Sequence, residues 1–258
     1  MRKLFLFDMD GTLTPARKSM KHDMLGQLKK LNNLEWEIGI ISGSDMDYIT
    51  QQCNVLFDLS PINSGDIHFL PCNGTKYYKN RQKVWEYSMI EKLGESIMKN
   101  IMKTLIHYQN QIVSLYDIPL TGNFIEMRGS VINWCPIGRN AMEKDRASWV
   151  ELDKEKEIRE NYIQQFMSKF FKEMITIKLG GETSFDIYPN GWNKTFPLTL
   201  EPFNQFNRIY FAGDRCGING NDKELYDYLN AKENCRGFFI NNEKETMEII
   251  ERIVQEEQ

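Results

Sequence analysis

The sequence has little of what builds disulfide-rich, metal-cage or membrane proteins. Its five cysteines are scattered and form no Cys-x-x-Cys pair, which argues against a disulfide framework or a cysteine zinc site. Only three histidines are present, so any metal is expected on carboxylates. The N-terminal apolar run Leu4–Phe7 is too short for a signal-peptide core or a membrane span. These absences predict a cytoplasmic protein with reduced thiols and no membrane partner.

The sequence also lacks an excess of charge of either sign. Its 32 lysines and arginines against 36 aspartates and glutamates leave a net charge of −4, which argues against a nucleic-acid partner. A composition of 41% hydrophobic and 26% charged residues is that of an ordinary globular protein. A chain of 258 residues suits one large domain or two modest ones.

The first part of the chain alternates between strand and helix patterns. Apolar runs over residues 4–7 and 37–41 predict buried parallel strands, and a helical stripe covers residues 18–31. Asp45 is the expected N-cap of the next helix. The alternation indicates a doubly wound α/β fold. Further strands and a closing helix are expected over residues 208–212, 238–240 and 243–256.

Between these two parts the pattern changes. Helical stripes cover residues 89–106 and 153–174. Two pairs of extended runs each surround a glycine-containing turn, which predicts antiparallel hairpins over residues 124–134 and 175–188. Helices mixed with hairpins indicate an inserted α+β module. We therefore expect a discontinuous core of residues 1–84 and 189–258 and a cap of residues 85–188.

Four segments with reactive side chains follow the predicted strands or mark the return to the core. Open α/β sheets bind ligands at the carboxyl ends of their strands, so we expect these segments to meet. Together they offer an acid, a hydroxyl, a cation and a second acid, a set that suits phosphoryl transfer. The segments contain Asp8 and Asp10, Ser42, Lys194, and Asp214 and Asp222.

The two acids after the first strand have different expected roles. Asp8, at the strand end, is the expected nucleophile and would carry an aspartyl-phosphate. Asp10 lies two residues further, where an extended chain points to the same side, and is the expected general acid and base. Ser42 and Lys194 are expected to bind the oxygens of the transferring group.

Carboxylates this close repel each other unless a cation lies between them. The hard cation most often held by carboxylates near phosphoryl groups is magnesium. We therefore predict a Mg²⁺ site formed by Asp8, the backbone carbonyl of Asp10, Asp214 and Asp222.

Several arginines offer a grip for a second phosphate. Arg128, Arg139 and Arg146 are spaced 11 and 7 residues apart across the first hairpin and the segment after it. Arg17 follows the nucleophile loop. One arginine alone usually pairs loosely with a surface carboxylate, but a cluster beside a hairpin fits a bidentate phosphate clamp.

The four reactive segments resemble the motifs of the haloacid dehalogenase-like superfamily. Longer stretches are similar to eukaryotic phosphomannomutases and occur in order over nearly the whole chain. The resemblance implies a Rossmann-like core with an inserted antiparallel cap, and a homodimer joined through the caps. The stretches are DGTLTPAR at 10–17, ISGSD at 41–45, FIEMRG at 124–129, CPIGR at 135–139, GGETSFDIYPNGWNK at 180–194 and GDRCGINGND at 213–222.

The activity implied by this resemblance is the interconversion of mannose 6-phosphate and mannose 1-phosphate, which supplies GDP-mannose synthesis. It proceeds through an aspartyl-phosphate and uses a hexose 1,6-bisphosphate as activator and intermediate. Ser184 and Asp186 share one face of a predicted strand, so both can meet sugar hydroxyls. The substrate contacts that the resemblance implies are Arg17, Arg128, Arg139, Arg146, Ser184 and Asp186.

Three alternatives stay open at this point. A sugar-phosphate phosphatase on the same fold would need Asp8, Asp10, Lys194 and Asp214 but not the cap arginines. Mannose and glucose differ at one hydroxyl, so dual phosphomannomutase and phosphoglucomutase activity also fits the sequence. A non-catalytic binding protein is disfavoured, because each catalytic role has an intact candidate.

Two features depart from the family pattern. Asn193 stands in GWNK where the family is expected to have an aspartate, so this position offers hydrogen bonds but no charge. The family's second, structural cation site falls on Tyr226, Tyr228 and Ala231. Because Tyr228 and Ala231 are poor oxygen ligands, we do not expect that second site here.

Overall fold

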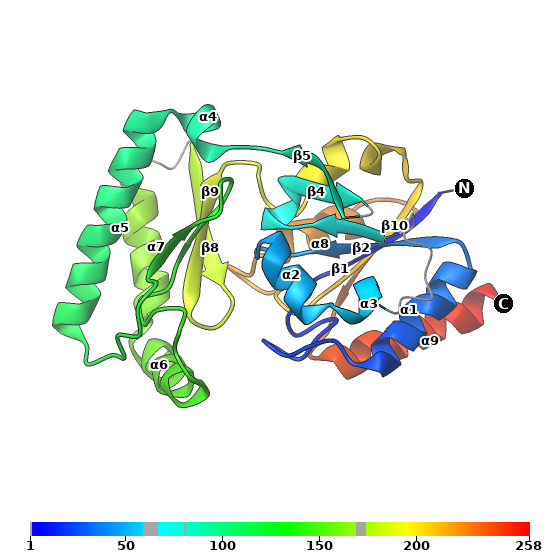
Figure 1. Cartoon of the computed structure of the whole chain (residues 1–258), viewed down its shortest axis with the longest axis horizontal. Coiled ribbons are helices and arrows are strands. Elements are labelled where there is room, and N and C mark those ends of the chain that lie inside the picture. Colours follow the sequence, from blue (N-terminus) through cyan, green and yellow to red (C-terminus); the bar gives the residue numbers. More distant parts are fainter. Residues whose placement is uncertain (1, 59–66, 80, 169–173) are drawn as a thin grey trace. The chain divides into compact units, whose positions relative to one another are not determined.

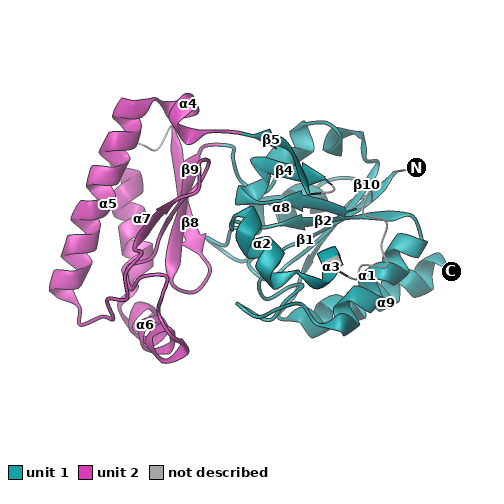
Figure 2. Cartoon of the chain, in the orientation of Figure 1, with its two compact units in different colours: residues 1–86, 191–258 teal, residues 87–190 magenta. Residues whose placement is uncertain are grey.

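The computed structural model describes residues 2–58, 67–79, 81–168 and 174–258. The chain divides into two compact units, which Figure 2 shows in different colours. Unit 1 comprises Met1–Glu86 and Gly191–Gln258, and unit 2 comprises Tyr87–Asn190. Among the helices of the described ranges, none has the length and apolar character needed to cross a membrane.

A seven-stranded sheet with the order β11-β10-β1-β2-β3-β4-β5 forms the centre of unit 1 (Figure 1). The pairs from β11 to β3 are parallel, which confirms the predicted parallel sheet. The antiparallel pairs that β4 and β5 add at one edge were not predicted. The strands are β1 (Lys3–Phe7), β2 (Trp36–Ile41), β3 (Ile67–Leu70), β4 (Lys76–Lys79), β5 (Gln82–Glu86), β10 (Arg208–Gly213) and β11 (Arg236–Phe239).

β1 is covered on both faces of the sheet, and its apolar side chains point to each face in turn. Phe5 and Phe7 belong to one apolar cluster, which includes residues of α1 and α9, and these two helices pack side by side (Figure 1). Leu4 and Leu6 belong to a second cluster, which includes residues of α8. A strand covered on both sides is apolar throughout, which explains the run LFLF. The described helices of unit 1 are α1 (His22–Asn33), α2 (Met46–Gln52), α3 (Val55–Asp58), α8 (Lys223–Asn230) and α9 (Glu243–Glu257), with short 3-10 turns at Cys72–Gly74, Phe196–Thr199 and Phe203–Gln205.

Unit 2 contains a separate four-stranded antiparallel sheet with the order β6-β7-β9-β8. Both predicted hairpins are confirmed, since β6 pairs with β7 and β8 pairs with β9. Trp134 on β7 stacks on Phe185 on β9 with 4.4 Å between ring centroids, and Tyr162 packs edge-on against Trp134. The elements are β6 (Ile125–Met127), β7 (Ile132–Trp134), β8 (Ile175–Gly180), β9 (Ser184–Pro189), α4 (Met89–Leu93), α5 (Glu95–Leu115), α6 (Glu143–Lys156) and α7 (Ile158–Ser168).

Two predicted helices of unit 2 are wrong in their bounds. The helix expected over residues 89–106 is two helices, because Gly94 has a φ of 82° and separates α4 from α5. The helix expected over residues 153–174 is interrupted at Glu157, whose left-handed φ of 51° ends α6. Residues 169–173 of that prediction lie outside the described residues, and Met174 is not helical.

Candidate active site

A predicted site aspartate follows each of the neighbouring strands β1 and β10. Phe7 pairs with Ala212 in parallel register, so Asp8 and Asp214 leave the sheet at the same edge. The backbone N–H of Asp8 donates to the carbonyl oxygen of Ala212 at 2.9 Å. Asp222 is at the N-cap position of α8. One carboxylate oxygen from each of the three aspartates lies within 4.8 Å of the others. The structure thus brings together three of the predicted metal ligands.

Lys194 is fully buried between two of these carboxylates. Its ammonium donates to Oδ1 of Asp8, and also to Oδ1 of Asp222 at 2.5 Å. The backbone N–H of Arg215 donates to the other oxygen of Asp222 at 2.9 Å. Because a buried ammonium needs compensating charge, these contacts fix Lys194 within the carboxylate cluster.

Two glycines make room for the cluster. Gly11 has a φ of 84°, and a Cβ at this position would lie 2.7 Å from Oδ2 of Asp214. A Cβ on Gly213 would lie 2.6 Å from Oδ2 of Asp222. Both separations are too short for a methyl group beside an oxygen, so larger residues would displace the carboxylates.

Burial sets the charge balance of the cluster. It raises the pKa of Asp8 well above the ordinary value, Lys194 opposes this shift, and Asp222 and Asp214 add to it. Burial also raises the pKa of Asp214 to about 6, with a further contribution from Asp222. For Lys194, burial lowers the pKa, but Asp222 and Asp8 outweigh it and the net shift is upward. Two cations thus face three carboxylates: the ammonium of Lys194, and the guanidinium of Arg215, whose Nε lies 3.3 Å from Oδ2 of Asp214.

The cluster fits a hard divalent cation. Oδ1 of Asp214 is buried and has no hydrogen-bond partner among the described residues. An orphaned carboxylate oxygen beside two more carboxylates is a donor set that Mg²⁺ accepts. A cation at this position would add positive charge to that of Lys194 and Arg215, which face three carboxylates.

The carboxylate of Asp10 makes a separate set of contacts. Its Oδ1 accepts hydrogen bonds from the backbone N–H of Arg17 at 2.7 Å and from the hydroxyl of Tyr48 at 3.2 Å. Arg17 itself has a left-handed φ of 58°. The predicted metal contact of Asp10 is its backbone carbonyl, and its side chain is not one of the three clustered carboxylates.

Ser42 follows β2 at the edge of the sheet where Asp8 follows β1, because the two strands are parallel neighbours. It is buried, and its Oγ accepts a hydrogen bond from the backbone N–H of Ser44 at 3.1 Å. Its carbonyl oxygen accepts from the backbone N–H of Asn73 at 2.8 Å. The loop after β2 thus holds the serine at the carboxyl end of the sheet.

In unit 2, two of the predicted arginines share one carboxylate. Arg128 donates from Nε and Nη2 to Oε2 of Glu126 at 2.8 and 2.7 Å, and Nε of Arg139 lies 3.3 Å from the same oxygen. Glu126 orients both guanidinium groups as a phosphate oxygen would. No role was predicted for Glu126, which lies on β6 two residues before Arg128.

Asn133 connects this arginine pair to the predicted sugar contacts. Its Oδ1 accepts from Nη1 of Arg139 at 2.9 Å. Its Nδ2 donates to Oγ of Ser184 at 3.1 Å and to Oδ1 of Asp186 at 2.7 Å. No role was predicted for Asn133 either. The sequence feature that could have pointed to it is its place as a polar residue between the apolar residues of β7.

The remaining two predicted phosphate contacts have other partners. Arg146 donates to Oγ1 of Thr183 at 3.2 Å and to Oε2 of Glu182 at 3.1 Å, both in the turn between β8 and β9. Arg17 belongs to unit 1, where it contacts Asp10. The structure therefore groups Arg128, Arg139, Ser184 and Asp186 through Glu126 and Asn133, and Arg146 contacts the turn that precedes Ser184.

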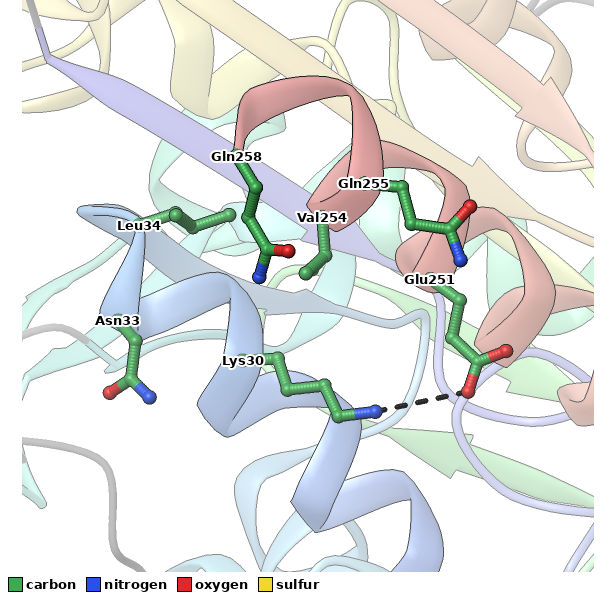
Figure 3. Close-up of a pocket in the computed structure, with 7 residues that line it drawn as sticks. All are labelled: Lys30, Asn33, Leu34, Glu251, Val254, Gln255 and Gln258. Carbon is green, nitrogen blue, oxygen red and sulfur yellow. Dashed lines mark ion pairs between the residues drawn. The ribbon is translucent and has the colours of Figure 1, made fainter.

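A surface pocket of about 460 Å³ lies between α1 and α9 (Figure 3). Lys30 and Glu251 face each other there at 3.8 Å, and Leu34 and Val254 form part of its wall. None of the predicted site residues lines this pocket, so it is separate from the carboxylate cluster.

The sequence is similar to one family and to its curated members. The model of eukaryotic phosphomannomutase matches residues 23–256. A phosphomannomutase of Schizosaccharomyces pombe is 36% identical over 226 residues, which are 87% of this chain and 85% of that protein. The phosphomannomutase of Spinacia oleracea is 34% identical over 94% of this chain and 92% of that protein. That of Saccharomyces cerevisiae is 33% identical over 96% of this chain and 92% of that protein.

Solved structures of similar fold have much lower sequence identity. An IMP-nucleotidase of Plasmodium falciparum bound to IMP has a TM-score of 0.62 and 14% identity, covering 98% of this chain and 68% of that chain. The C-terminal domain of a C. albicans trehalose-6-phosphate phosphatase has a TM-score of 0.61 and 16% identity, and the match covers 98% of this chain and 92% of that chain. These likenesses concern the fold, and they agree with the α/β arrangement described above.

Proposed function

The chain belongs to the eukaryotic phosphomannomutase family, and on that basis we propose that it interconverts mannose 6-phosphate and mannose 1-phosphate. The observation that carries the proposal is the buried carboxylate of Asp8, paired with Lys194 beside Asp214 and Asp222. A strand-end carboxylate beside an ammonium and a cation site suits attack on phosphorus.

Asp8 performs the first half-reaction. One of its oxygens attacks a phosphorus of hexose 1,6-bisphosphate, and the bond from that phosphorus to the sugar oxygen breaks. Asp10 gives a proton to the departing sugar oxygen. Lys194 and Ser42 stabilise the charge on the phosphoryl oxygens. The products of this half-reaction are the aspartyl-phosphate of Asp8 and a hexose monophosphate.

The second half-reaction returns the phosphoryl group. Asp10 takes the proton of the free hydroxyl of a hexose monophosphate, and that oxygen attacks the phosphorus on Asp8. Free Asp8 is restored, and it next accepts the phosphoryl group from the other end of the sugar. Exclusion of water during this exchange protects the aspartyl-phosphate from hydrolysis.

Mg²⁺ is the proposed cofactor, held by Asp8, the backbone carbonyl of Asp10, Asp214 and Asp222. Bound there, it would neutralise charge on the phosphoryl group in transfer. The donor set supports this assignment, because the unpartnered oxygen of Asp214 lies beside two more carboxylates. With this cofactor, the proposed activity is that of a Mg-dependent intramolecular phosphotransferase of the isomerase class.

Unit 2 is the proposed site for the phosphate that does not react. Arg128 and Arg139 are already oriented by a shared carboxylate, which supports a bidentate grip. Ser184 and Asp186 are the proposed contacts for sugar hydroxyls, and Asn133 holds both in one network. Arg146 of unit 2 and Arg17 of unit 1 are further proposed phosphate contacts.

The proposed setting is a cytoplasmic homodimer that supplies mannose 1-phosphate for GDP-mannose synthesis. All five cysteines, each within the described ranges, are free thiols, which suits a reducing compartment. Unit 2 also exposes large apolar side chains, among them Leu115 at 69% and Met142 at 73%, which suits a contact between copies. Light scattering after size-exclusion chromatography tests the dimer by giving twice the chain mass.

The experiment that tests the proposed function is a coupled assay with mannose 1-phosphate and added mannose 1,6-bisphosphate. We expect mannose 6-phosphate as the main product, with turnover that depends on the bisphosphate. Inorganic phosphate as the main product would instead identify a sugar-phosphate phosphatase. The same assay with glucose 1-phosphate measures whether phosphoglucomutase activity accompanies the mannose reaction.

A further inference from the structure

A tyrosine hydroxyl contacts the proposed acid–base residue. The hydroxyl of Tyr48 donates to Oδ1 of Asp10 at 3.2 Å, and the backbone N–H of Arg17 donates to the same oxygen at 2.7 Å. Two donors on one oxygen fix the rotation of the carboxyl group. They also make Oδ1 the acceptor oxygen, so the proton that Asp10 exchanges belongs on Oδ2.

The fold holds Tyr48 firmly in this orientation. Tyr48 lies in the first turn of α2 (Figure 1), where its backbone N–H donates to the capping oxygen Oδ1 of Asp45 at 3.0 Å. Its partly buried ring packs against the apolar cluster that contains Phe5 and Phe7 of β1. The predicted N-cap at Asp45 is thus confirmed, and it fixes the backbone of the helical turn that carries Tyr48.

We propose that Tyr48 is a positioning residue for phosphoryl transfer, acting through the carboxyl group of Asp10. This inference rests on the proposed function, because it assumes that Asp10 exchanges a proton with the sugar oxygen. With Oδ1 held by Tyr48 and Arg17, Oδ2 is presented to the sugar oxygen in each half-reaction. Tyr48 itself makes no bond that breaks or forms.

This role predicts a particular pattern of kinetic change. Without the hydroxyl, Oδ1 loses one of the two donors described above, and the carboxyl group of Asp10 rotates more freely. Proton exchange with the sugar oxygen then becomes slower, so kcat falls. The proposed phosphate contacts are unchanged, so KM does not rise. A tyrosine that serves only as a core aromatic predicts no kinetic change on loss of its oxygen.

The test compares the wild-type chain with Tyr48→Phe, which removes one oxygen and keeps the ring. We expect kcat to fall about tenfold, while KM for mannose 1-phosphate stays within about twofold. In a single turnover with labelled mannose 1,6-bisphosphate, phosphorylation of Asp8 should slow by the same factor. Tyr78→Phe is the matched control, because Tyr78 also packs partly buried against the same apolar cluster, on β4.

The outcomes separate this inference from the function it rests on. Suppose that the wild-type chain catalyses the mutase reaction. If Tyr48→Phe then has the same kcat as the wild type, or a change no larger than that of Tyr78→Phe, the role of Tyr48 is overturned and the proposed function stands. A rise in KM that accounts for the whole loss, or a loss of folded protein by thermal melting, would overturn that role too. A wild-type chain that never becomes phosphorylated would overturn the proposed function and the inference together.

Discussion

The ammonium of Lys194 donates to Oδ1 of Asp222 at 2.5 Å, and both side chains are completely buried. The same ammonium contacts the proposed nucleophile, Asp8. A lysine in this position links α8 to the loop after β1 and offsets part of the negative charge of the cluster. The stability of unit 1 and the chemistry of Asp8 thus depend on one cation.

Replacing Lys194 with methionine should therefore destabilise the protein strongly. Methionine keeps the length of the side chain but leaves Asp8 and Asp222 buried without their partner. We expect a loss of about 3–5 kcal/mol in the free energy of unfolding, measured in urea with a chelator present. We also expect no phosphorylation of Asp8, because the charge that stabilises the phosphoryl oxygens is gone.

Lys223→Met is the matched control, because Lys223 also pairs with an aspartate, Asp227, at 2.6 Å but on the exposed surface of α8. Its unfolding midpoint and its activity should stay close to wild type, since exposed ion pairs contribute little. Equal losses in the two variants would show that burial of the Lys194 pair has no special energetic role.

Acid should destabilise unit 1 through the buried imidazole of His68. Nε2 of His68 lies 2.8 Å from Oε2 of Glu37, and Nδ1 lies 2.8 Å from the hydroxyl of Tyr77. Burial lowers the pKa of His68, although Glu37 opposes the shift. Burial raises the pKa of Glu37, but hydrogen bonds from His68 and Arg2 outweigh it and the net shift is downward.

Both shifts have the same consequence for stability. Below about pH 6.5 the histidine binds a proton in the unfolded chain but not in the folded one. The free energy of unfolding therefore decreases as the pH is lowered from 6.5 toward the depressed pKa of folded His68. Glu37 lowers the stability further below about pH 4.5, because there its carboxylate binds a proton in the unfolded chain but not yet in the folded one. Urea midpoints between pH 7.5 and 5 should fall in the wild type and fall less in His68→Gln. His107→Gln, which replaces an exposed histidine, should keep the wild-type slope. A flat wild-type profile would contradict this assignment.

Arg159 should support the turn between β8 and β9. Its Nε donates to Oδ2 of Asp153 at 2.6 Å, and its Nη1 donates to the carbonyl oxygen of Gly181 at 2.9 Å. Arg159→Met removes the side-chain donor from Oδ2 of Asp153 and from the carbonyl oxygen of Gly181, and should cost about 3 kcal/mol in urea unfolding.

Because Thr183 and Ser184 lie in or beside that turn, KM for mannose 1-phosphate should rise more than kcat falls in Arg159→Met. Lys99→Met, which changes an exposed cation on α5, is the control and should alter neither quantity. A stable Arg159→Met variant with wild-type KM would contradict the role of Arg159 in the turn.

Asn193→Asp should have little effect. Oδ1 of Asn193 accepts from the backbone N–H of Thr195 at 2.9 Å and from its hydroxyl at 2.6 Å, and a carboxylate oxygen can accept both bonds. We expect kcat within about twofold of wild type, whereas Asn193→Ala should lose about 1 kcal/mol of stability. A large gain in kcat for Asn193→Asp would show that charge at this position acts on Lys194.

The features that sequence alone predicted are those with a local signal. The run LFLF marks β1 because both of its faces are covered, and the acid that follows it lies at the sheet edge as expected. Asp45 precedes α2 at the spacing of an N-cap, and the hairpins of unit 2 have glycine at their turns. In each case neighbouring residues determine the conformation.

The features that were missed depend on contacts between distant residues. β4 and β5 carry lysines, tyrosines and exposed side chains that resemble a loop, and they become strands only by pairing at the sheet edge. Glu126 gains its role from Arg139, and Arg159 gains its role from Gly181. The spacing of residues along the chain does not predict such partners, because only the fold brings them together.

Phosphorylation of Asp8 is the central claim, and trapping the phosphoenzyme tests it most directly. The wild-type chain, given Mg²⁺ and mannose 1,6-bisphosphate, is quenched in acid, reduced with borohydride and analysed by mass spectrometry. Reduction converts an aspartyl-phosphate to homoserine, and we expect this change at Asp8 and not in Asp8→Asn. Modification at Asp10 or at another residue, or none at all during active turnover, would contradict the account.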